Sequence, residues 1–221
     1  MGSVRPAGFA ALALLGGCAI AFPDGKIIDA ALLLKLTALS ATEDGRKFLF
    51  VTTGTHNGNF ATGFANGIAG ADAFCATQKN TYYGGLPGTS YKALLVDSGT
   101  NRRACSTSNC AGGAAEHVDW VLAANTTYYL PDGSKAFTTD ATGILVFNPP
   151  TVQFSQALAA ATGTHWWTGM FTDWVVQTHC TNWSVTAGSA EYGRGTHVDS
   201  GAISFNADLC TALDFVVCIR Q

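Results

Sequence analysis

The side chains most able to do chemistry in this chain are five histidines and a sparse set of carboxylates. His197, Asp199 and Glu191 are close enough in sequence to meet on a loop, where an imidazole and two carboxylates would bind a metal ion. Neither H-E-x-x-H nor H-x-x-x-H occurs, so no two histidines have the spacing that places metal ligands on one helix face. We therefore interpret these three residues as part of a solvated polar loop and expect no metal.

Two further arrangements would support catalysis. His179 precedes Cys180, a pairing that can activate a thiolate, but a disulfide at Cys180 would consume the thiol. Asp173 and Glu191 are of the type that glycoside hydrolases use as acid and base, although nothing in the sequence brings them together. The chain has no G-x-S-x-G motif, no phosphate-binding loop and no dinucleotide fingerprint. We expect no enzymatic activity and no cofactor.

Six of the seven cysteines lie in the part of the chain with a globular pattern, and Cys18 stands apart from them. The six are Cys75, Cys105, Cys110, Cys180, Cys210 and Cys218. An even set behind a leader favours three disulfides in an oxidising compartment over free thiols in the cytosol. Six cysteines allow about fifteen pairings. A local bridge between Cys105 and Cys110 would pin the loop that holds both.

The N-terminus has the features of a secretory leader. One cation, Arg5, precedes an apolar run over residues 7–15, which is too short to cross a bilayer because a span needs about 20 residues. The run ends in Leu-Gly-Gly-Cys at residues 15–18, which resembles the lipobox of bacterial lipoproteins. That resemblance implies that Cys18 is the first residue of the mature chain and carries an acyl anchor in the membrane. The alternative is an ordinary leader in which Cys18 is incidental.

Composition favours one turn-rich domain behind this leader. Of 221 residues, 12% are charged, 48% are hydrophobic and 25 are glycines. A net charge of −3, with no basic cluster larger than Arg102-Arg103, argues against nucleic acid and against polyanionic glycans as partners. We predict a signal peptide at 1–17, a lipidated linker at 18–45 and a single domain at 46–221.

Short apolar segments predict the strands of this domain, and one amphipathic segment predicts its main helix. The expected strands are 47–53, 91–96, 118–122, 127–130, 144–147 and 213–219. Because residues 213–219 are mostly apolar in succession, we expect that strand to be central and buried on both faces. The best helix is 68–79, which places Cys75 on its buried side. Shorter helices are expected at 27–39 and 151–161.

Four of the five tryptophans lie within residues 165–219. Trp166 and Trp167 are adjacent, so on a strand they must point to opposite faces. We therefore expect Trp167 and Trp183 in the core, and Trp166 and Trp174 on the surface, where exposed aromatic rings anchor protein partners and stack on sugars. The candidate ligand-binding residues are Trp166, Trp174, Asn182, Glu191 and Tyr192.

Two blocks of sequence resemble the endostatin-like branch of the C-type-lectin-like fold. The first has I-A-G-A-D-A-F-C at 68–75 and G-L-P-G-T at 85–89; the second has C-T-N-W at 180–183 and V-C-I at 217–219. The pattern from Lys47 onward is also similar to a family of bacterial, especially spirochaetal, lipoproteins of unassigned function. The resemblance implies an α+β domain with twisted, mostly antiparallel sheets, one main N-terminal helix and a long irregular loop region.

The resemblance also implies nested disulfides. Cys75 on the helix would pair with Cys218 on the last strand, and Cys180 would pair with Cys210 across the long loop. With the local bridge between Cys105 and Cys110, this gives the three disulfides that we predict.

The sequence departs from the sugar-binding lectins of this fold. Those proteins hold calcium with an E-P-N or Q-P-D loop and a W-N-D triplet, and neither loop motif occurs here. Phe205-Asn206-Ala207 stands in place of the triplet, so alanine replaces the aspartate ligand. Calcium takes six to eight oxygen ligands, and we expect no calcium-dependent sugar site. The clustered arginines with which endostatin binds heparin are also missing.

These features together predict a lipid-anchored protein of the bacterial outer membrane or cell surface. We expect its lectin-like domain to bind an extracellular protein or glycan, without calcium, through the loop 172–204. The alternative is a structural envelope protein that assembles with itself or with other envelope components and has no soluble ligand.

Overall fold

The computed structural model describes residues 20–21, 27–28 and 45–221. The chain divides into two units, Met1–Glu43 and Asp44–Gln221. In the first unit, β1 (Ile20–Ala21) pairs antiparallel with β2 (Ile27–Ile28). The helix expected at 27–39 is therefore wrong at its start, because β-branched isoleucines favour this extended pairing. Residues 29–39, the predicted signal peptide and Cys18 lie outside the described residues.

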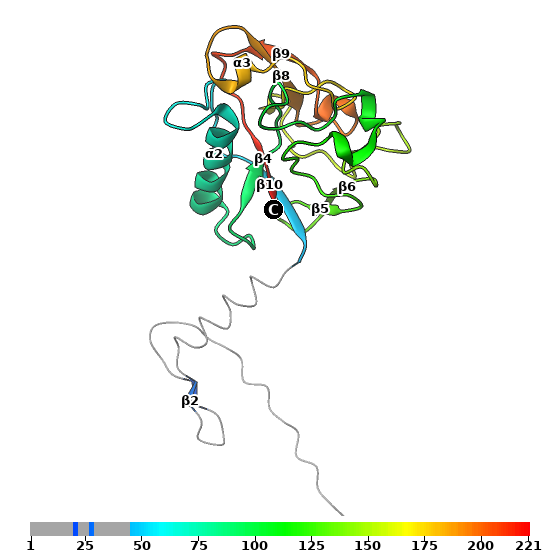
Figure 1. Ribbon diagram of the computed structural model, residues 1–221. Helices are drawn as coiled ribbons and strands as arrows, with labels where there is room; N and C mark the ends of the chain where they lie inside the picture. The colour runs from blue at the N-terminus through cyan, green and yellow to red at the C-terminus, as the bar shows by residue number, and fades with distance from the viewer. Residues whose placement is uncertain (1–19, 22–26, 29–44) are drawn as a thin grey trace, which may run out of the picture. The chain divides into compact units, whose positions relative to one another are not determined.

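The second unit is built on a five-stranded sheet in the order β4-β10-β3-β5-β6 (Figure 1). Its strands are β3 (Lys47–Val51), β4 (Tyr91–Ala93), β5 (Thr127–Tyr129), β6 (Lys135–Thr138) and β10 (Val217–Arg220). Neighbouring strands are antiparallel except β3 and β5, which run parallel. The last strand of the chain is thus central, as its apolar sequence predicts, but it begins at Val217 and not at the predicted residue 213, and Leu213 is exposed.

Two hydrophobic cores lie on the two faces of this central strand. Because strand residues alternate in direction, Val217 and Ile219 enter the loop-side core, while Val216 and Cys218 enter the helix-side core. The loop-side core includes Leu49, Leu94, Tyr128, Phe137, Phe154 and Trp174, and the helix-side core includes Phe50, Ile68, Cys75, Trp167 and Trp183.

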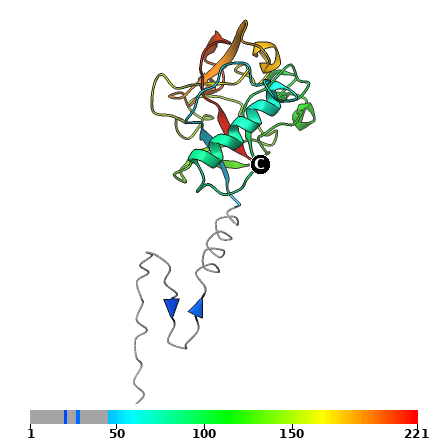
Figure 2. The ribbon, with the colours of Figure 1, turned by 90° about the vertical axis from the view of Figure 1, so that its left-hand side faces the viewer.

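Helix α2 (Gly67–Tyr82) covers the face of the sheet that belongs to the helix-side core, as Figure 2 shows. The Asn66 side chain caps its start by accepting a hydrogen bond from the Ala69 amide at 2.8 Å. Cys75 is fully buried on the inner side of the helix and is joined to Cys218 on β10. The helix and its buried cysteine are where the sequence predicts them.

A second, three-stranded antiparallel sheet has the order β7-β8-β9. Its strands are β7 (His165–Trp167), β8 (Ser189–Arg194) and β9 (Asn206–Leu209). Short helical turns lie in the connections: η1 (Ser108–Cys110) and η2 (Gly113–Glu116) between β4 and β5, α3 (Cys180–Trp183) between β7 and β8, and η3 (Ser200–Ala202) between β8 and β9. The described domain is thus mixed α+β with mostly antiparallel sheets, as predicted.

Three expected elements are wrong, and four strands of the domain were not among those expected. Residues 118–122 and 144–147 are not strands and 151–161 is not a helix, whereas β6 and every strand of the second sheet form where no strand was predicted. Apolar side chains of all three segments, such as Val121, are nevertheless buried in the loop-side core. A run of apolar residues predicts that a segment is buried, but it does not show that the segment is a strand or a helix. Here the buried segments are irregular, and local turns satisfy their backbone hydrogen bonds.

Three disulfides hold the described domain together, with the pairing that we predict. Cys75–Cys218 spans 143 residues of sequence, Cys180–Cys210 spans 30 and Cys105–Cys110 spans 5. In the chain-entropy model a bridge over the longest of these loops stabilises the fold by about 5 kcal/mol, and the shortest by about 2 kcal/mol. The helix-to-last-strand bridge is therefore the main covalent constraint.

Candidate functional site

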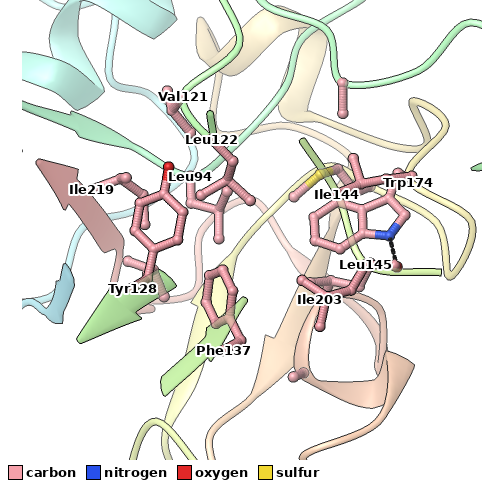
Figure 3. Close-up of a cluster of buried hydrophobic side chains, with 14 of the residues drawn as sticks. Leu94, Val121, Leu122, Tyr128, Phe137, Ile144, Leu145, Trp174, Ile203 and Ile219 are labelled. Atoms are coloured by element: carbon pink, nitrogen blue, oxygen red, sulfur yellow. Dashed lines mark hydrogen bonds between the residues drawn. The ribbon is translucent and has the colours of Figure 1, made fainter. Parts of the chain in front are cut away.

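The four tryptophans of the C-terminal region are all fully buried, including Trp166 and Trp174, which we expected on the surface. Trp174 packs in the loop-side core, where its indole nitrogen donates to the Leu145 carbonyl at 2.6 Å (Figure 3). Trp166 donates to the Ala202 carbonyl at 2.9 Å. Both rings thus bury their apolar area and still satisfy their N–H groups.

The alternation of Trp166 and Trp167 on β7 is as expected, but its consequence differs. Trp166 enters the loop-side core and Trp167 enters the helix-side core, because β7 lies between two cores and has no solvent face at this point. Opposite Trp166 on β8, a Cβ at Gly193 would lie 1.9 Å from the Ala202 carbonyl oxygen, so this close packing requires glycine.

The other three candidate residues also have internal roles. Glu191 is buried and its Oε1 accepts a hydrogen bond from the Ser204 hydroxyl at 2.8 Å, and burial raises the pKa of the carboxyl. Tyr192 is buried and stacks on His165 at 4.4 Å between ring centroids. Asn182 accepts from the Ser98 amide at 2.9 Å. The expected surface exposure of Trp166 and Trp174 is wrong, and the five candidate residues do not form one exposed surface.

The turn α3 lies at the start of the predicted binding loop and has an unusual backbone. Its four residues have positive φ, from 49° at Cys180 and 50° at Thr181 to 58° at Asn182 and 61° at Trp183. No glycine relieves this left-handed conformation. The turn is held by the Cys180–Cys210 disulfide, by the buried Trp183, and by the His179 ring nitrogen, which accepts from the Asn182 amide at 2.9 Å.

The catalytic and metal arrangements considered from sequence do not assemble. Cys180 is in a disulfide, so His179 has no thiol to activate. His197 pairs with Asp199 at 3.0 Å on the surface, while Glu191 is bonded to Ser204 instead. Among the described hydrogen bonds and ion pairs, none joins Asp173 to Glu191.

The loop 172–204 is not one exposed loop, since it contains α3 and the whole of β8. The most exposed large apolar side chains of the domain follow it, at the last residue of β9 and in the turn that comes next. Leu209 is 64% exposed and Leu213 is 65% exposed. The Ala212 amide donates to the Leu209 carbonyl at 2.8 Å, and Cys210 between the leucines is bridged to Cys180. We call residues 209–213 the Leu209–Leu213 turn.

An ion cluster that the sequence did not reveal surrounds the buried Arg102, between α2 and the loop after β4. Arg102 is completely buried and makes a two-pronged contact with Asp72, both bonds being 2.8 Å. It also donates to Asp119 at 2.6 Å, and Asp119 in turn pairs with Lys92. Burial alone would lower the pKa of Arg102, but its bonds to Asp72 and Asp119 raise it. The pKa of Asp119 is lowered, despite its partial burial, by its bonds to Lys92 and Arg102. The cluster ties the helix to the loop and has a structural role.

One set of side chains in the described residues has the composition of a metal site. His165 at the start of β7, Asp208 on β9 and Asp214 after the Leu209–Leu213 turn place one ligand atom each within 4.8 Å of the others. Burial and the nearby Asp208 raise the pKa of Asp214 to about 6. Burial and the charge of Arg194 lower the pKa of His165, which favours the neutral ring that binds metals.

Comparison with known proteins places this domain in a family. A family model described as a protein of unknown function, DUF1554, matches residues 53–199. The chain belongs to the DUF1554 family. The DUF1554 match covers α2, α3 and β8, and it ends before the Leu209–Leu213 turn and before Cys210 and Cys218. No curated protein matches the chain. Within the described residues, no helix has the length and apolar character needed to cross a membrane.

Proposed function

We propose that this chain is a lipid-anchored protein of the bacterial outer membrane or cell surface. Its domain would belong to the endostatin-like branch of the C-type-lectin-like fold. The domain would bind a protein ligand without calcium. The leader and the Leu-Gly-Gly-Cys segment support the anchor. The three disulfides support an oxidising compartment. The main helix joined to the central last strand, together with the sequence blocks, supports the fold and the likeness to spirochaetal lipoproteins.

The observation that carries the binding proposal is the exposure of Leu209 and Leu213 on a rigid turn. Exposed leucines held by a disulfide and by backbone bonds lose little conformational entropy on binding, because their backbone is already ordered. Apolar side chains left in solvent at a fixed position are typical of protein interaction sites. The ligand would therefore contact the Leu209–Leu213 turn, beyond the loop 172–204 that the sequence favoured.

The structure favours a protein over a glycan as the ligand. At the Leu209–Leu213 turn the exposed large side chains are leucines, whereas sugar binding without calcium commonly uses aromatic faces on which sugar rings stack. Four of the five tryptophans are fully buried, and the fifth, Trp120, is partly buried with its indole nitrogen bonded to the Gly143 carbonyl. The exposed leucines lack the flat face that a sugar needs.

One observation favours the alternative of a structural envelope protein. The uniform burial of the loop tryptophans removes the aromatic anchors that a soluble ligand would use. In that case the leucines of the Leu209–Leu213 turn would contact another copy of this chain or a second envelope component.

Binding measurements with matched surface variants separate these functions. We would immobilise the full chain and probe it with panels of extracellular matrix proteins, host serum proteins and glycans. The double variant Leu209→Ser/Leu213→Ser is expected to lose protein binding, while Tyr82→Ser, which removes a 56% exposed ring from α2, retains it. Binding that persists in the double variant contradicts the proposal. Absence of binding to every probe, with cross-linking of the chain to itself on intact cells, favours the envelope alternative.

A further inference from the structure

Three ligand-type side chains converge beside the Leu209–Leu213 turn. His165, Asp208 and Asp214 each offer one nitrogen or oxygen atom, and these atoms lie within 4.8 Å of one another. A zinc ion with bond lengths of about 2.0–2.1 Å would need tetrahedral ligands about 3.3 Å apart. Small side-chain rotations would close that difference.

The backbone at all three positions is fixed by pairing. His165 is opposite Arg194 in the β7–β8 pair, and its carbonyl accepts from the Phe215 amide at 3.0 Å. Asp214 exchanges two backbone hydrogen bonds with His56, at 2.8 and 3.2 Å. Asp208 lies on β9 opposite Ala190. The ligands are thus preorganised, which limits the entropy lost when an ion binds.

Asp214 lacks a partner of its own. The residue is only 6% exposed, and its Oδ2 is buried without any hydrogen-bond partner among the described residues. A buried carboxylate that is neither hydrogen-bonded nor paired is costly and uncommon in a folded protein. The nearby carboxylate of Asp208 adds like charge, while its own Oδ1 accepts from the Leu209 amide at 2.7 Å. A cation between the two carboxylates would satisfy Asp214 and remove this repulsion.

We propose that His165, Asp208 and Asp214 bind one divalent transition-metal ion, with Zn²⁺ the best match. An imidazole with two carboxylates is a donor set for zinc and related ions, whereas calcium needs six to eight oxygens. Three protein ligands leave at least one position for water. The bound ion joins the start of β7 to both ends of the segment 208–214 and so braces the Leu209–Leu213 turn. This site does not depend on the ligand proposed for that turn.

Calorimetric titration with ZnCl₂ tests the site directly. The protein would be the full chain carrying Cys18→Ser, so that no thiol outside the three disulfides can bind the ion, after treatment with EDTA and dialysis. We expect one ion per chain and a higher melting temperature with zinc. Asp214→Asn and Asp208→Asn should each weaken binding by more than about tenfold. Asp208 is partly exposed, so its variant tests the site even if Asp214→Asn folds poorly.

The matched control is Asp199→Asn. It removes a carboxylate from the His197–Asp199 pair, which is also a histidine with an aspartate at 3.0 Å but is not one of the three proposed ligands. Its zinc affinity should equal that of the parent chain. The proposal is overturned if no saturable binding occurs, if Asp208→Asn binds as tightly as the parent, or if only Asp199→Asn loses the ion.

Discussion

Arg102 shows how one buried cation can be fully satisfied without water. Its five donor hydrogens go to Asp72, twice, to the Asp119 carboxylate, and to the carbonyls of Asp119 and Ala93. Asp72 also accepts from the Ala93 amide at 2.9 Å, so the pair anchors β4 as well as α2. Only a guanidinium has the geometry to serve all of these acceptors.

Replacing Arg102 with methionine should lower the free energy of unfolding by about 3 kcal/mol, because Asp72 would keep its charge without a cation. The neighbouring Arg103→Met is the control. Arg103 is partly exposed and donates to the Glu116 carbonyl at 2.9 Å, so its loss should cost less than about 1 kcal/mol. Urea unfolding with the disulfides intact measures both, and equal losses would contradict the structural role of Arg102.

Glu116 makes the stability of the domain depend on pH. Its carboxylate accepts from the Thr107 hydroxyl at 2.6 Å, from the Ser106 hydroxyl, and from the amides of Ser106, Thr107 and Gly112. With the Thr107 hydroxyl bond the largest cause, these bonds lower the pKa of Glu116 to about 2. A lowered acid pKa stabilises the fold above the unfolded value near 4.5, and this stabilisation is lost as the pH falls to about 2.

Glu116→Gln should therefore be less stable than the parent at pH 7 and equally stable near pH 2. Glu191→Gln is a control of opposite sign. Burial raises the pKa of Glu191, so its ionisation destabilises the fold as the pH rises, and its replacement should not reduce stability at pH 7. Urea unfolding across this pH range gives both differences. A constant difference between Glu116→Gln and the parent from pH 2 to 7 would show that the carboxylate charge is not involved.

Among the elements, α3 carries the most backbone strain. Each non-glycine residue in the left-handed region costs about 1–2 kcal/mol, and here four follow one another. The compensation comes from Trp183, whose indole nitrogen donates to the Val96 carbonyl at 2.6 Å in the helix-side core, and from the disulfide to Cys210. The turn thus joins β9 to the helix-side core.

Thr181→Gly should stabilise the protein by about 1 kcal/mol. Glycine removes a strain of about 1–2 kcal/mol at φ 50°, less about 0.4–1 kcal/mol for the greater freedom of the unfolded chain. Thr62→Gly is the control, since Thr62 is also exposed but is not among the residues with positive φ, and it should lose stability. Thermal unfolding measures both, and a lower melting temperature for Thr181→Gly would mean that the turn is not strained.

At the scale of the whole molecule, the proposed anchor makes a prediction about location. If Cys18 carries acyl chains, the parent protein expressed in a bacterial host with lipoprotein processing should incorporate a labelled fatty acid and partition into detergent. Cys18→Ser should do neither, while the domain 44–221 keeps its three disulfides. Incorporation of label into Cys18→Ser would place the acyl group elsewhere and remove the lipobox interpretation.

The amino-acid sequence by itself determined the elements whose signals are local. Helix α2 follows from the spacing of its apolar residues, and the central place of β10 follows from its continuous apolar side chains. The disulfide pairing came from the resemblance to a known fold, because spacing alone left it open. Strands were wrongly predicted at 118–122 and 144–147. These irregular segments are buried in the loop-side core, so they contain as many apolar residues as a strand would.

Only the tertiary structure decided which residues reach solvent and which meet one another. Trp166 and Trp174 look like exposed anchors in sequence, yet both are buried in the loop-side core, and a core built largely from irregular chain leaves no sign in local periodicity. The ion partners of Arg102 and the cluster of His165, Asp208 and Asp214 are each drawn from separate segments of the chain. Such contacts follow from chain topology: Arg102 and Asp72, for example, are 30 residues apart and impose no spacing on the sequence between them.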